Sequence, residues 1–285
     1  GIASAAAHDG DAPHCSPDTS VKEASGTSMA APFVAAQAAI VRQYFVEGRH
    51  PSGVPTAADI MQPSAALVKA VLVSSSVCPP ARRWSAKDES WSWLPSCPDP
   101  SRGYGMPLLG MTLHLNQPNQ SICRPSLWVL DIPSTQGLET GDVVQVTGLT
   151  LDNTTSIQCG GGVEPPHPAN ASRPNDRTTQ VKATLVWSDY PGLPGAGIAL
   201  VNDLDLTVES ETTSWLGGHG ATPDFVNNVE QVVVPVEEGG MLSVRVVADY
   251  IVHGPQGLAL VVVGHFSGEP NVTVIRHTRK VNYTL

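Results

Sequence analysis

The 285-residue sequence predicts a chain of two parts, the first built on two helices and the second all β. Three observations lead to this division. The run Phe33–Val46 is almost wholly small or apolar, which is typical of a buried helix. The segment Pro63–Ser76 carries apolar residues at helical spacing. From about residue 120, alternating segments of Val, Thr and Leu lie between clusters of Gly, Pro and Asn, which is typical of strands joined by turns.

The composition describes a folded, acidic protein. Hydrophobic residues make up 41% of the chain and charged residues 15%, which are globular proportions. The net charge of -10 argues against nucleic acid as a partner, because phosphate binding needs clustered Lys and Arg. No apolar run reaches the roughly 18 residues that a membrane-spanning helix requires. We therefore expect neither a nucleic-acid partner nor a membrane span in this sequence.

The first helix is expected to begin close to Ser28. Ser and Thr are common N-caps, because their side-chain oxygens accept hydrogen bonds from free N–H groups. Pro32 is expected in the first turn, where its missing N–H costs nothing. The residues from Phe33 to Val46 carry no polar stripe, so this helix is expected to be buried nearly all round. From these residues alone, Ser28 is either an ordinary N-cap or a hydroxyl placed for chemistry.

The second helix is expected over about Pro63–Ser76, with Pro63 at its first helical position. Residues 77–102 then form a Pro-, Ser- and Trp-rich stretch that is longer than a compact connection needs. We interpret it as an inserted loop closed by a Cys78–Cys97 disulfide. Its three tryptophans, Trp84, Trp91 and Trp93, are expected to pack the loop down rather than to form a binding surface.

The second part is predicted to be an antiparallel sandwich or jelly roll, because it has many strands and no helical run. It covers residues 121–266 and includes a loop at 160–178, while residues 267–285 are expected to be a tail. The clearest strands are Val181–Trp187, Leu204–Val208, Val229–Val234, Leu242–Val246 and Leu258–Val263. In the first of these, Val181, Ala183, Leu185 and Trp187 share one face.

Cysteines and glycosylation sequons indicate an oxidising compartment. The five cysteines are Cys15, Cys78, Cys97, Cys123 and Cys159, and none lies in a C-x-x-C pair. We expect Cys123–Cys159 as a second disulfide, with Cys15 unpaired or bonded to a cysteine upstream. The Asn-x-Ser/Thr sequons are at Asn119, Asn153, Asn170, Asn271 and Asn282. Together these features predict a location in the secretory pathway, outside the cell or on its surface.

A group of acidic residues lies in or beside three of the predicted strands. Asp203 and Asp205 share one face of a strand, although Asp is disfavoured in strands and two on one face repel each other. Asp189 and Glu230 are expected to converge on the same edge. Hard oxygen ligands of this kind suit calcium. The alternative is a solvated polar face whose aspartates accept hydrogen bonds from turn backbone.

One stretch resembles the active-site serine motif of the subtilisin-like serine peptidases (subtilases): Gly26-Thr27-Ser28-Met29-Ala30-Ala31-Pro32, followed by an Ala-rich apolar run. Flanking segments are similar to this family as well. Gly1-Ile2-Ala3-Ser4-Ala5 resembles a segment that precedes the serine motif, and the segment around Gly103-Tyr104-Gly105 resembles the element that closes the catalytic domain. The resemblance implies that residues 1–120 are the C-terminal portion of an α/β catalytic domain.

The second part resembles the jelly-roll domain appended to one branch of subtilases. The segments that carry this likeness are Leu185–Asp189, Leu200–Leu206, Asn227–Glu230 and Gly254–Gln256. Related jelly-roll domains bind calcium, so the resemblance adds to the case for a calcium site. The likeness runs in patches from residue 1 to about 266, and residues 267–285 match nothing in it.

The resemblance implies a role for Ser28 as the nucleophile of a serine endopeptidase that cleaves protein or peptide substrates through an acyl-enzyme. A serine hydroxyl needs a histidine base oriented by a carboxylate. Subtilases carry these residues in the order Asp, His, Ser, so both partners, and the oxyanion-hole Asn, are expected upstream of Gly1. On this interpretation, residues 1–285 alone are inert.

Three alternatives remain at this point. The first is a local triad of Ser28 with a nearby histidine and aspartate, although these lie in a Gly- and Pro-rich loop without rigid support, where solvated side chains are the better interpretation. The candidates for that triad are His8, His14, Asp9, Asp11 and Asp18. The second is a catalytically inactive relative that serves as a binding or adhesion module. The third is a calcium-stabilised β-domain with a structural role.

Overall fold

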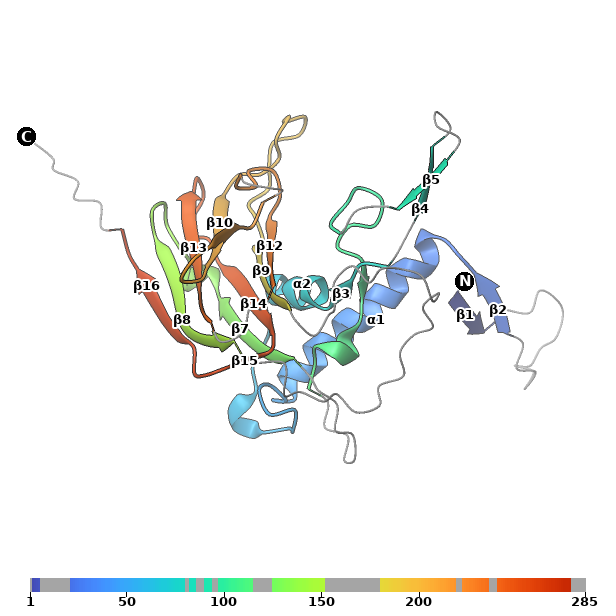
Figure 1. Cartoon of the computed structure of the whole chain (residues 1–285), viewed down its shortest axis with the longest axis horizontal. Coiled ribbons are helices and arrows are strands. Elements are labelled where there is room, and N and C mark those ends of the chain that lie inside the picture. Colours follow the sequence, from blue (N-terminus) through green and yellow to red (C-terminus); the bar gives the residue numbers. More distant parts are fainter. Residues whose placement is uncertain are drawn as a thin grey trace, which may run out of the picture.

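The structure is a computed structural model that describes residues 2–5, 21–79, 82–85, 90–93, 97–114, 125–151, 180–218, 222–235 and 240–277. A two-sheet β-sandwich forms its main body, and helices α1 (Thr27–Val46) and α2 (Ala65–Ser74) lie beside one face of it (Figure 1). Short 3₁₀ turns occur at Ala57–Asp59, Leu109–Met111 and Ser134–Gln136. Among the described residues, no helix is long and apolar enough to span a membrane.

The sandwich strands in chain order are β7 (Ser126–Ile132), β8 (Val143–Leu151), β9 (Gln180–Val186), β10 (Asp203–Glu209), β11 (Ser214–Leu216), β12 (Val229–Pro235), β13 (Met241–Tyr250) and β14 (Leu258–Gly264). They pair antiparallel as β7 with β14, β8 with β13, β9 with β12 and β10 with β11. This nested pairing is that of a long hairpin rolled into two sheets, which defines a jelly roll. The predicted antiparallel sandwich is confirmed.

The core between the sheets follows the alternation of the strands. One sheet has the order β12-β9-β14-β7 and the other β11-β10-β13-β8. On β9, Val181, Ala183, Leu185 and the following Trp187 are all buried in this core, as the sequence predicts. On β13, Leu242, Val244 and Val246 point into the same core, while the residues between them lie nearer solvent.

A second core lies on the other face of the β12-β9-β14-β7 sheet. Val186 of β9 and Val261 of β14 pack there against Phe45 of α1 and Leu67 of α2. Strand β14 is therefore buried on both faces, which explains why Leu258–Gly264 is an unbroken apolar run. The described body has three layers: helices, a four-stranded sheet and the second sheet (Figure 1).

Helix α2 begins two residues later than the sequence suggests. Its N-cap is Ser64, whose Oγ accepts the Leu67 N–H at 3.0 Å, so Pro63 precedes the helix and is not its first residue. The same serine donates from Oγ to Asp131 Oδ1 at 2.6 Å, and its N–H donates to Asp131 Oδ2 at 2.8 Å. One carboxylate at the end of β7 thus fixes the start of α2 on the sandwich, a long-range contact that local sequence cannot show.

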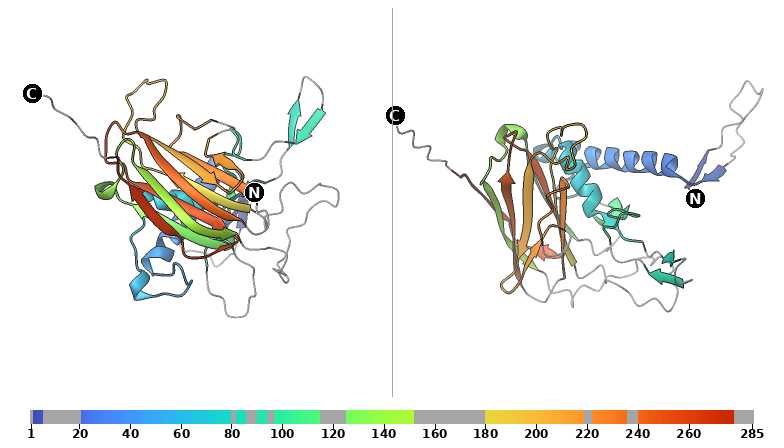
Figure 2. Two further views of the ribbon diagram at one scale, coloured as in Figure 1. Left: turned by 60° about the vertical axis from the view of Figure 1, so that its left-hand side comes forward. Right: turned by 90° about the horizontal axis from the view of Figure 1, so that it is seen from above.

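Helix α1 differs most from expectation. It begins at Thr27, so Pro32 is its sixth residue and lies inside the helix, not in the first turn. Its buried residues are Gln37, Val41, Tyr44 and Phe45, whereas the first half is exposed, with Phe33 at 47%. The expectation of burial all round is wrong for the described residues, because only the C-terminal half packs on α2 and joins the core that α2 shares with the sheet. Figure 2 shows the first half extending away from the sandwich.

Within the part of the chain that the structure describes, three small antiparallel ladders lie outside the sandwich. They are β1 (Ile2–Ala5) with β2 (Val21–Ala24), β3 (Ser76–Val77) with β6 (Met106–Pro107), and β4 (Arg82–Ser85) with β5 (Ser90–Trp93). The last pair places Trp84 opposite Trp91 within the predicted inserted loop. The Cys78–Cys97 disulfide is confirmed, with a Cα–Cα distance of 5.5 Å. Cys15, Cys123, Cys159 and the predicted loop at 160–178 lie outside the described residues.

The chain remains part of the sandwich beyond residue 266, where the sequence suggests a tail. Strands β15 (Phe266–Ser267) and β16 (Asn271–Ile275) both pair with β8 and extend its sheet. Directly after β16 in the chain, Arg276 donates to Asp142 Oδ2 at 2.8 Å and to the Gly137 carbonyl at 2.6 Å. The His277 N–H donates to Asp142 Oδ1 at 2.7 Å. These bonds hold the segment because Asp142 is itself buried in the sandwich.

Candidate functional site

Ser28 is the second residue of α1 and is exposed. The N-cap residue Gly26 has φ 145° and ψ 171°, a conformation that a residue with a side chain rarely adopts. Its carbonyl accepts the N–H groups of Met29 and Ala30, each at 3.1 Å. The glycine therefore allows the chain to turn sharply into the helix, and this places the Ser28 hydroxyl in its first turn.

The backbone around Ser28 favours negative charge. The first N–H groups of an α-helix, which include that of Ser28, have no carbonyl acceptor within the helix, and the helix dipole places partial positive charge there. The first turn contains no acidic residue that would neutralise this charge. Pro32 lacks the N–H that would reach the Ser28 carbonyl four residues earlier. The site combines an exposed hydroxyl with N–H donors, which is the arrangement that stabilises an oxyanion.

Three described histidines, His50, His114 and His253, make side-chain contacts with residues of the sandwich or of the loops next to it. His50 Nε2 is 3.1 Å from the Leu127 carbonyl, and His114 Nε2 is 2.8 Å from the Pro125 carbonyl. His253 stacks on Tyr190, with ring centroids 4.1 Å apart. Ser28 is in the first turn of α1, and Figure 2 shows this end of the helix extending away from the sandwich. The histidines and aspartates of the alternative local triad, His8, His14, Asp9, Asp11 and Asp18, lie outside the described residues.

Asp189, the first predicted calcium ligand, accepts backbone hydrogen bonds with both carboxylate oxygens. Oδ1 accepts the N–H groups of Tyr190 at 2.8 Å and Asn202 at 2.9 Å, and Oδ2 accepts that of Val201 at 2.8 Å. The side chain thereby closes the loop that joins β9 to β10. This is the role that the alternative interpretation assigns to a turn aspartate.

Glu230 is 1% exposed and joins the two sheets. Its Oε2 accepts the Leu206 N–H of β10 at 2.5 Å, and its Oε1 accepts the Asp224 N–H at 3.1 Å. The Leu206 carbonyl accepts the Gly217 N–H at 2.8 Å, directly after the end of strand β11. Glu230 therefore accepts a backbone N–H of β10 at the point where β11 no longer pairs with it. A Cβ at Gly217 would collide with the Glu230 carboxylate, which explains the glycine. Burial raises the pKa of Glu230 to about 8, although both backbone bonds oppose the rise.

Asp203 and Asp205 lie on the outer face of β10, while Leu204 and Leu206 point into the core. Each has a buried Oδ1 without a hydrogen-bond partner among the described residues. Burial and the nearby charges of Asp205 and Asp249 raise the pKa of Asp203 to about 6. Burial and the charge of Asp249 also raise the pKa of Asp205. These two carboxylates have oxygens left for a ligand.

The four predicted calcium ligands are not equivalent in the structure. The charge of Asp205 acts on both Asp203 and Glu230, and that of Asp189 acts on Asp203. Glu230 and Asp189, however, use their carboxylate oxygens for backbone N–H groups. Across the described parts of the chain, no group of three or more His, Cys, Asp or Glu side chains is placed to hold a metal ion. The geometry therefore supports at most Asp203 and Asp205 as carboxylate ligands of a cation.

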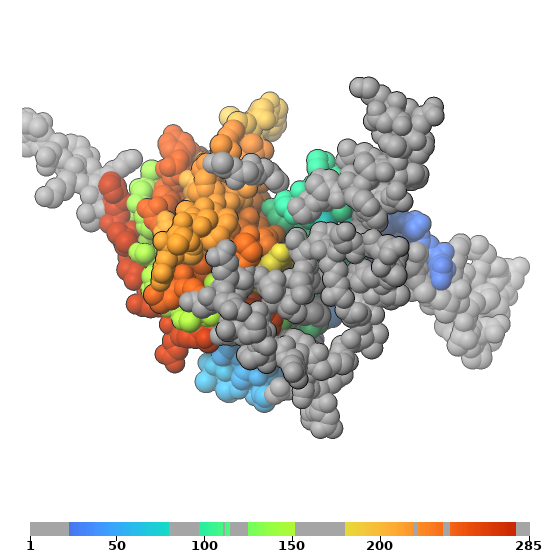
Figure 3. Space-filling model, in the orientation of Figure 1, coloured from blue at the N-terminus to red at the C-terminus, as the bar shows by residue number. Residues whose placement is uncertain are grey.

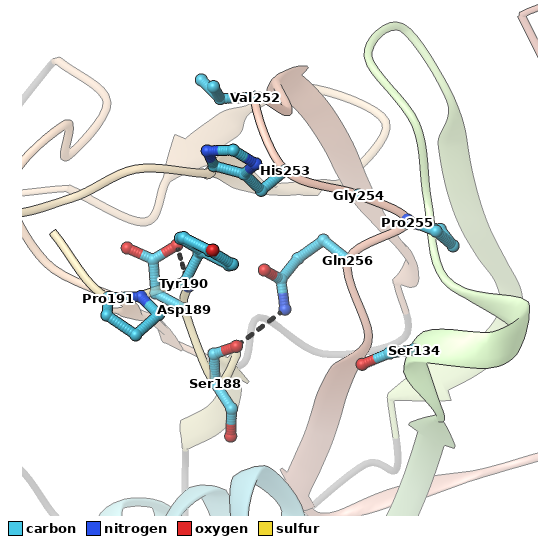
Figure 4. A pocket seen from close by; sticks show the side chains of 10 residues that line it. All are labelled: Ser134, Ser188, Asp189, Tyr190, Pro191, Val252, His253, Gly254, Pro255 and Gln256. Atoms are coloured by element: carbon cyan, nitrogen blue, oxygen red, sulfur yellow. Dashed lines mark hydrogen bonds between the residues drawn. The ribbon is translucent and has the colours of Figure 1, made fainter.

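Buried amides at one end of the sandwich form a network that the sequence analysis did not identify. The Asn202 Oδ1 accepts the N–H groups of Val252 and His253, and its Nδ2 donates to Gln256 Oε1 at 2.7 Å. Gln256 Nε2 donates to the Ser188 carbonyl at 3.1 Å, the bond drawn in Figure 4. Trp187 Nε1 donates to the Asn202 carbonyl at 3.0 Å. The one feature of the sequence that could have indicated this network is Asn202, a polar residue that follows the apolar segment Ile198–Val201.

A hollow of about 510 Å³ lies over this network (Figure 4). Its lining residues are Ser134, Ser188, Asp189, Tyr190, Pro191, Val252, His253, Gly254, Pro255 and Gln256. The Asp189 carboxylate and the Gln256 amide at its wall are already bonded within the protein. The hollow therefore offers stacking surface more than free polar groups, and it contains no residue of α1.

Polar contacts also join the helical part to the sandwich. Lys69 of α2 donates to Asn228 Oδ1 at 3.2 Å, and Lys182 of β9 donates to the Ser76 carbonyl at 2.8 Å. The Tyr104 hydroxyl is 3.3 Å from the Val229 carbonyl, and burial, with the charges of Asp224 and Glu230, raises the pKa of Tyr104 to about 12. Together with the shared core, these contacts fix α2 on the sandwich.

Comparison with known proteins gives a distant relationship to proteins named as serine proteases, while no protein-family model matches the chain. The relatives are "Serine protease/ABC transporter B family" proteins of Dictyostelium discoideum. The chain is 29% identical to tagD over 286 residues, 26% to tagB over 269 and 27% to tagA over 267. These matches cover 84%, 84% and 87% of this chain but only 14%, 13% and 13% of the relatives. The chain thus spans about one seventh of their length.

Proposed function

We propose that the protein is a subtilisin-like serine endopeptidase in which Ser28 is the nucleophile. The observation that carries this proposal is the placement of Ser28: exposed, at the N-terminus of a 20-residue helix, and behind a glycine with φ 145°. The distant similarity to proteins named as serine proteases supports it. Protein or peptide chains are the proposed substrates.

In the proposed reaction, Ser28 Oγ attacks the carbonyl carbon of the scissile peptide bond and forms an acyl-enzyme. The helix N-terminus stabilises the oxyanion through the Ser28 N–H and the helix dipole. A histidine takes the hydroxyl proton and passes it to the leaving amine, and an aspartate orients that histidine. We assign this His–Asp pair and the second oxyanion donor, an asparagine, to residues outside the segment 1–285.

The exposed first half of α1 supports this assignment. Phe33, Val34 and Ile40 are 47%, 38% and 44% exposed on a helix that also carries many alanines. Soluble proteins rarely leave an apolar surface of this kind uncovered. In the proposed α/β catalytic domain, the residues that bring the His–Asp pair also cover this surface, so one packing event completes both the core and the triad.

The test is covalent labelling of the full-length protein with a fluorophosphonate probe, which reacts with activated serines. We expect labelling of the wild-type protein and complete loss in Ser28→Ala. The matched control is Ser52→Ala, because Ser52 is an exposed serine whose hydroxyl, among the described residues, bonds to Val54 of its own turn. Labelling that persists in Ser28→Ala would show that another residue is the nucleophile. A folded wild-type protein that is never labelled would instead support the inactive binding module.

For location, we propose the secretory pathway. The disulfide between Cys78 and Cys97 supports this, because such bonds persist in oxidising compartments. Peptide mapping without reduction of protein from its own cells tests the proposal. We expect the Cys78–Cys97 cross-link to be recovered, and free thiols at both positions would contradict it.

A calcium ion is a second, separate proposal, favoured by the unpartnered oxygens of Asp203 and Asp205. Calcium bound there would neutralise two neighbouring carboxylates on one face of β10 and so stabilise the sandwich. We expect added calcium to raise the Tm of the wild-type protein in a chelated background and to have no effect on Asp205→Asn. Glu209→Gln is the control, because Glu209 lies on the same strand and face. An unchanged wild-type Tm would rule the calcium proposal out.

A further inference from the structure

Strand β16 forms an open edge of the sandwich. It pairs with β8 on one side, through a register that runs from Asn271 opposite Thr147 to Ile275 opposite Val143. Its other side has no partner strand among the described residues. All five residues are exposed, including Val272 at 37% and Ile275 at 50%. Figure 3 shows this strand, in red, along the outer border of the sandwich.

An exposed apolar edge strand is a template for pairing with another chain. Proteins commonly protect such edges with a charged side chain, a proline or a bulge within the strand. The sequence Asn-Val-Thr-Val-Ile of β16 contains neither a charge nor a proline. The next charged residue after β16 is Arg276. Its guanidinium bonds to Asp142 and to the carbonyls of Gln136 and Gly137, so it does not protect the open edge of β16.

The strand does contain a glycosylation sequon, Asn271-Val272-Thr273, and its geometry keeps the acceptor in solvent. Val272 and Val274 are opposite Val146 and Val144, which are buried between the sheets. Because side chains alternate along a strand, Asn271 and Thr273 lie on the outer face, opposite Thr147 and Gln145. Both are exposed, so a glycan on Asn271 fits without displacing core residues. Among the five sequons, this is the one whose asparagine is described.

We propose that Asn271 is an N-glycosylation site whose glycan shields the open edge of β16. In the reaction, the Asn271 Nδ2 bonds to the anomeric carbon of a lipid-diphosphate-linked oligosaccharide and loses one proton. The bond from that carbon to the diphosphate oxygen breaks, the lipid diphosphate leaves, and no oxidation or reduction takes place. The bulky, hydrated glycan then occupies the solvent beside the strand and prevents another strand from docking. The inference rests on the proposed secretory location.

The site is tested in the full-length protein, directed through the endoplasmic reticulum of a eukaryotic host by an added signal peptide. Glycopeptide mass spectrometry is expected to find Asn271 modified in the wild-type protein and in Thr273→Ser, which keeps the sequon. We expect complete loss in Asn271→Gln and Thr273→Val. An unmodified Asn271 in the secreted wild-type protein overturns the proposal. Because every variant enters the endoplasmic reticulum, that failure is distinct from a failure of the native location, which the disulfide mapping reports.

The shielding role is tested on the same secreted proteins by size-exclusion chromatography with light scattering. Asn271→Gln and Thr273→Val are expected to form larger species as concentration rises, while the wild-type protein and Thr273→Ser do not. Thr147→Val is the control, because it places a valine on the same outer face but keeps the sequon. Self-association that is equal in Thr147→Val and Thr273→Val would assign the effect to surface valine, and monodisperse unglycosylated variants would overturn shielding.

Discussion

The sandwich and the first half of α1 are both rich in apolar residues, yet they differ in what covers those residues. In the sandwich, Leu185, Leu206 and Leu260 are each at most 1% exposed, because two sheets of the same chain enclose them. On α1, Phe33 and Ile40 are 47% and 44% exposed. The described residues therefore complete the core of the sandwich, but around the first half of α1 they supply only one side of a core.

The largest expected effect comes from a matched pair of truncations, one in each region. Leu260→Ala removes a fully buried side chain from β14 and is expected to lower the free energy of unfolding by about 2–5 kcal/mol. Phe33→Ala in residues 1–285 is expected to change it by less than about 0.5 kcal/mol, because the side chain is exposed. Urea denaturation of the two variants measures both values. A large loss from Phe33→Ala in this chain would contradict the described exposure.

The same pair sharpens the comparison in the full-length protein. If the proposed catalytic domain covers α1, Phe33→Ala there is expected to cost about 3–5 kcal/mol, as a buried aromatic does. An equally small effect in both contexts would argue against the proposed cover of the helix.

A somewhat smaller effect is expected from the buried amide network of the sandwich. Asn202→Ala removes the acceptor of the Val252 and His253 N–H groups and the donor to Gln256 Oε1, which is expected to cost about 1–3 kcal/mol. Asn227→Ala is the matched control, because Asn227 is exposed and its side chain bonds to Asp224 within one turn. Equal midpoints in urea for the two variants would show that the network adds no stability.

The pH dependence of stability distinguishes the sandwich interior from an ordinary acidic surface. Folded Glu230 has a pKa of about 8 against an ordinary value of 4.5, and folded Asp203 has about 6 against 3.8. At a pH between the unfolded and folded pKa of each group, the folded protein holds a proton that the unfolded chain has lost. Stability therefore falls as pH rises, mainly from about 4.5 to about 8.

Thermal unfolding with chelator present, at a series of pH values, measures this slope. Glu230→Gln is expected to flatten the profile above about pH 6, whatever its effect on absolute stability, because the titrating carboxyl is gone. An identical slope in the wild-type protein and Glu230→Gln would assign the pH dependence to other groups.

The smallest effect is expected at the edge of the sandwich. The carboxylate of Asp142 is buried, and this alone would raise its pKa, but bonds from the Glu139 N–H, Arg276 and the His277 N–H lower it. Arg276→Ala is expected to cost about 1 kcal/mol, because the arginine end of the pair is partly exposed. Faster amide hydrogen exchange in β16, with the rest of the sandwich unchanged, is the specific readout. Unchanged exchange in β16 would show that Arg276 does not anchor it.

The sequence predicted strands well where apolar residues alternate with polar ones. The alternation in Val181–Trp187 and Leu242–Val246 predicted the strands and their buried faces, and the sandwich follows from their number and spacing. The spacing of Cys78 and Cys97 around a loop-like stretch predicted their bond. At the candidate site, the sequence placed Ser28 near a helix start, and the structure adds the conformation of Gly26 and the exposure of the hydroxyl.

The acidic residues show why the remaining details could not be predicted. Alternation correctly placed Asp203 and Asp205 on the outer face of their strand, but nothing local distinguishes them from Asp189 and Glu230 as ligands. That difference depends on which backbone N–H groups lie within reach, and these belong to residues up to 24 positions away. The same holds for Arg276, whose carboxylate partner is 134 residues earlier in the chain.

The sequence by itself determined five strands of the sandwich, the presence of helices α1 and α2, the Cys78–Cys97 pair and the serine behind Gly26, because periodicity, caps and backbone freedom are properties of neighbouring residues. Only the tertiary structure decided that Glu230 and Asp189 serve the backbone, that β16 closes onto β8, and that half of α1 is exposed. Burial and hydrogen-bond partners are set by segments that are distant in sequence, so they become known only when the chain is folded.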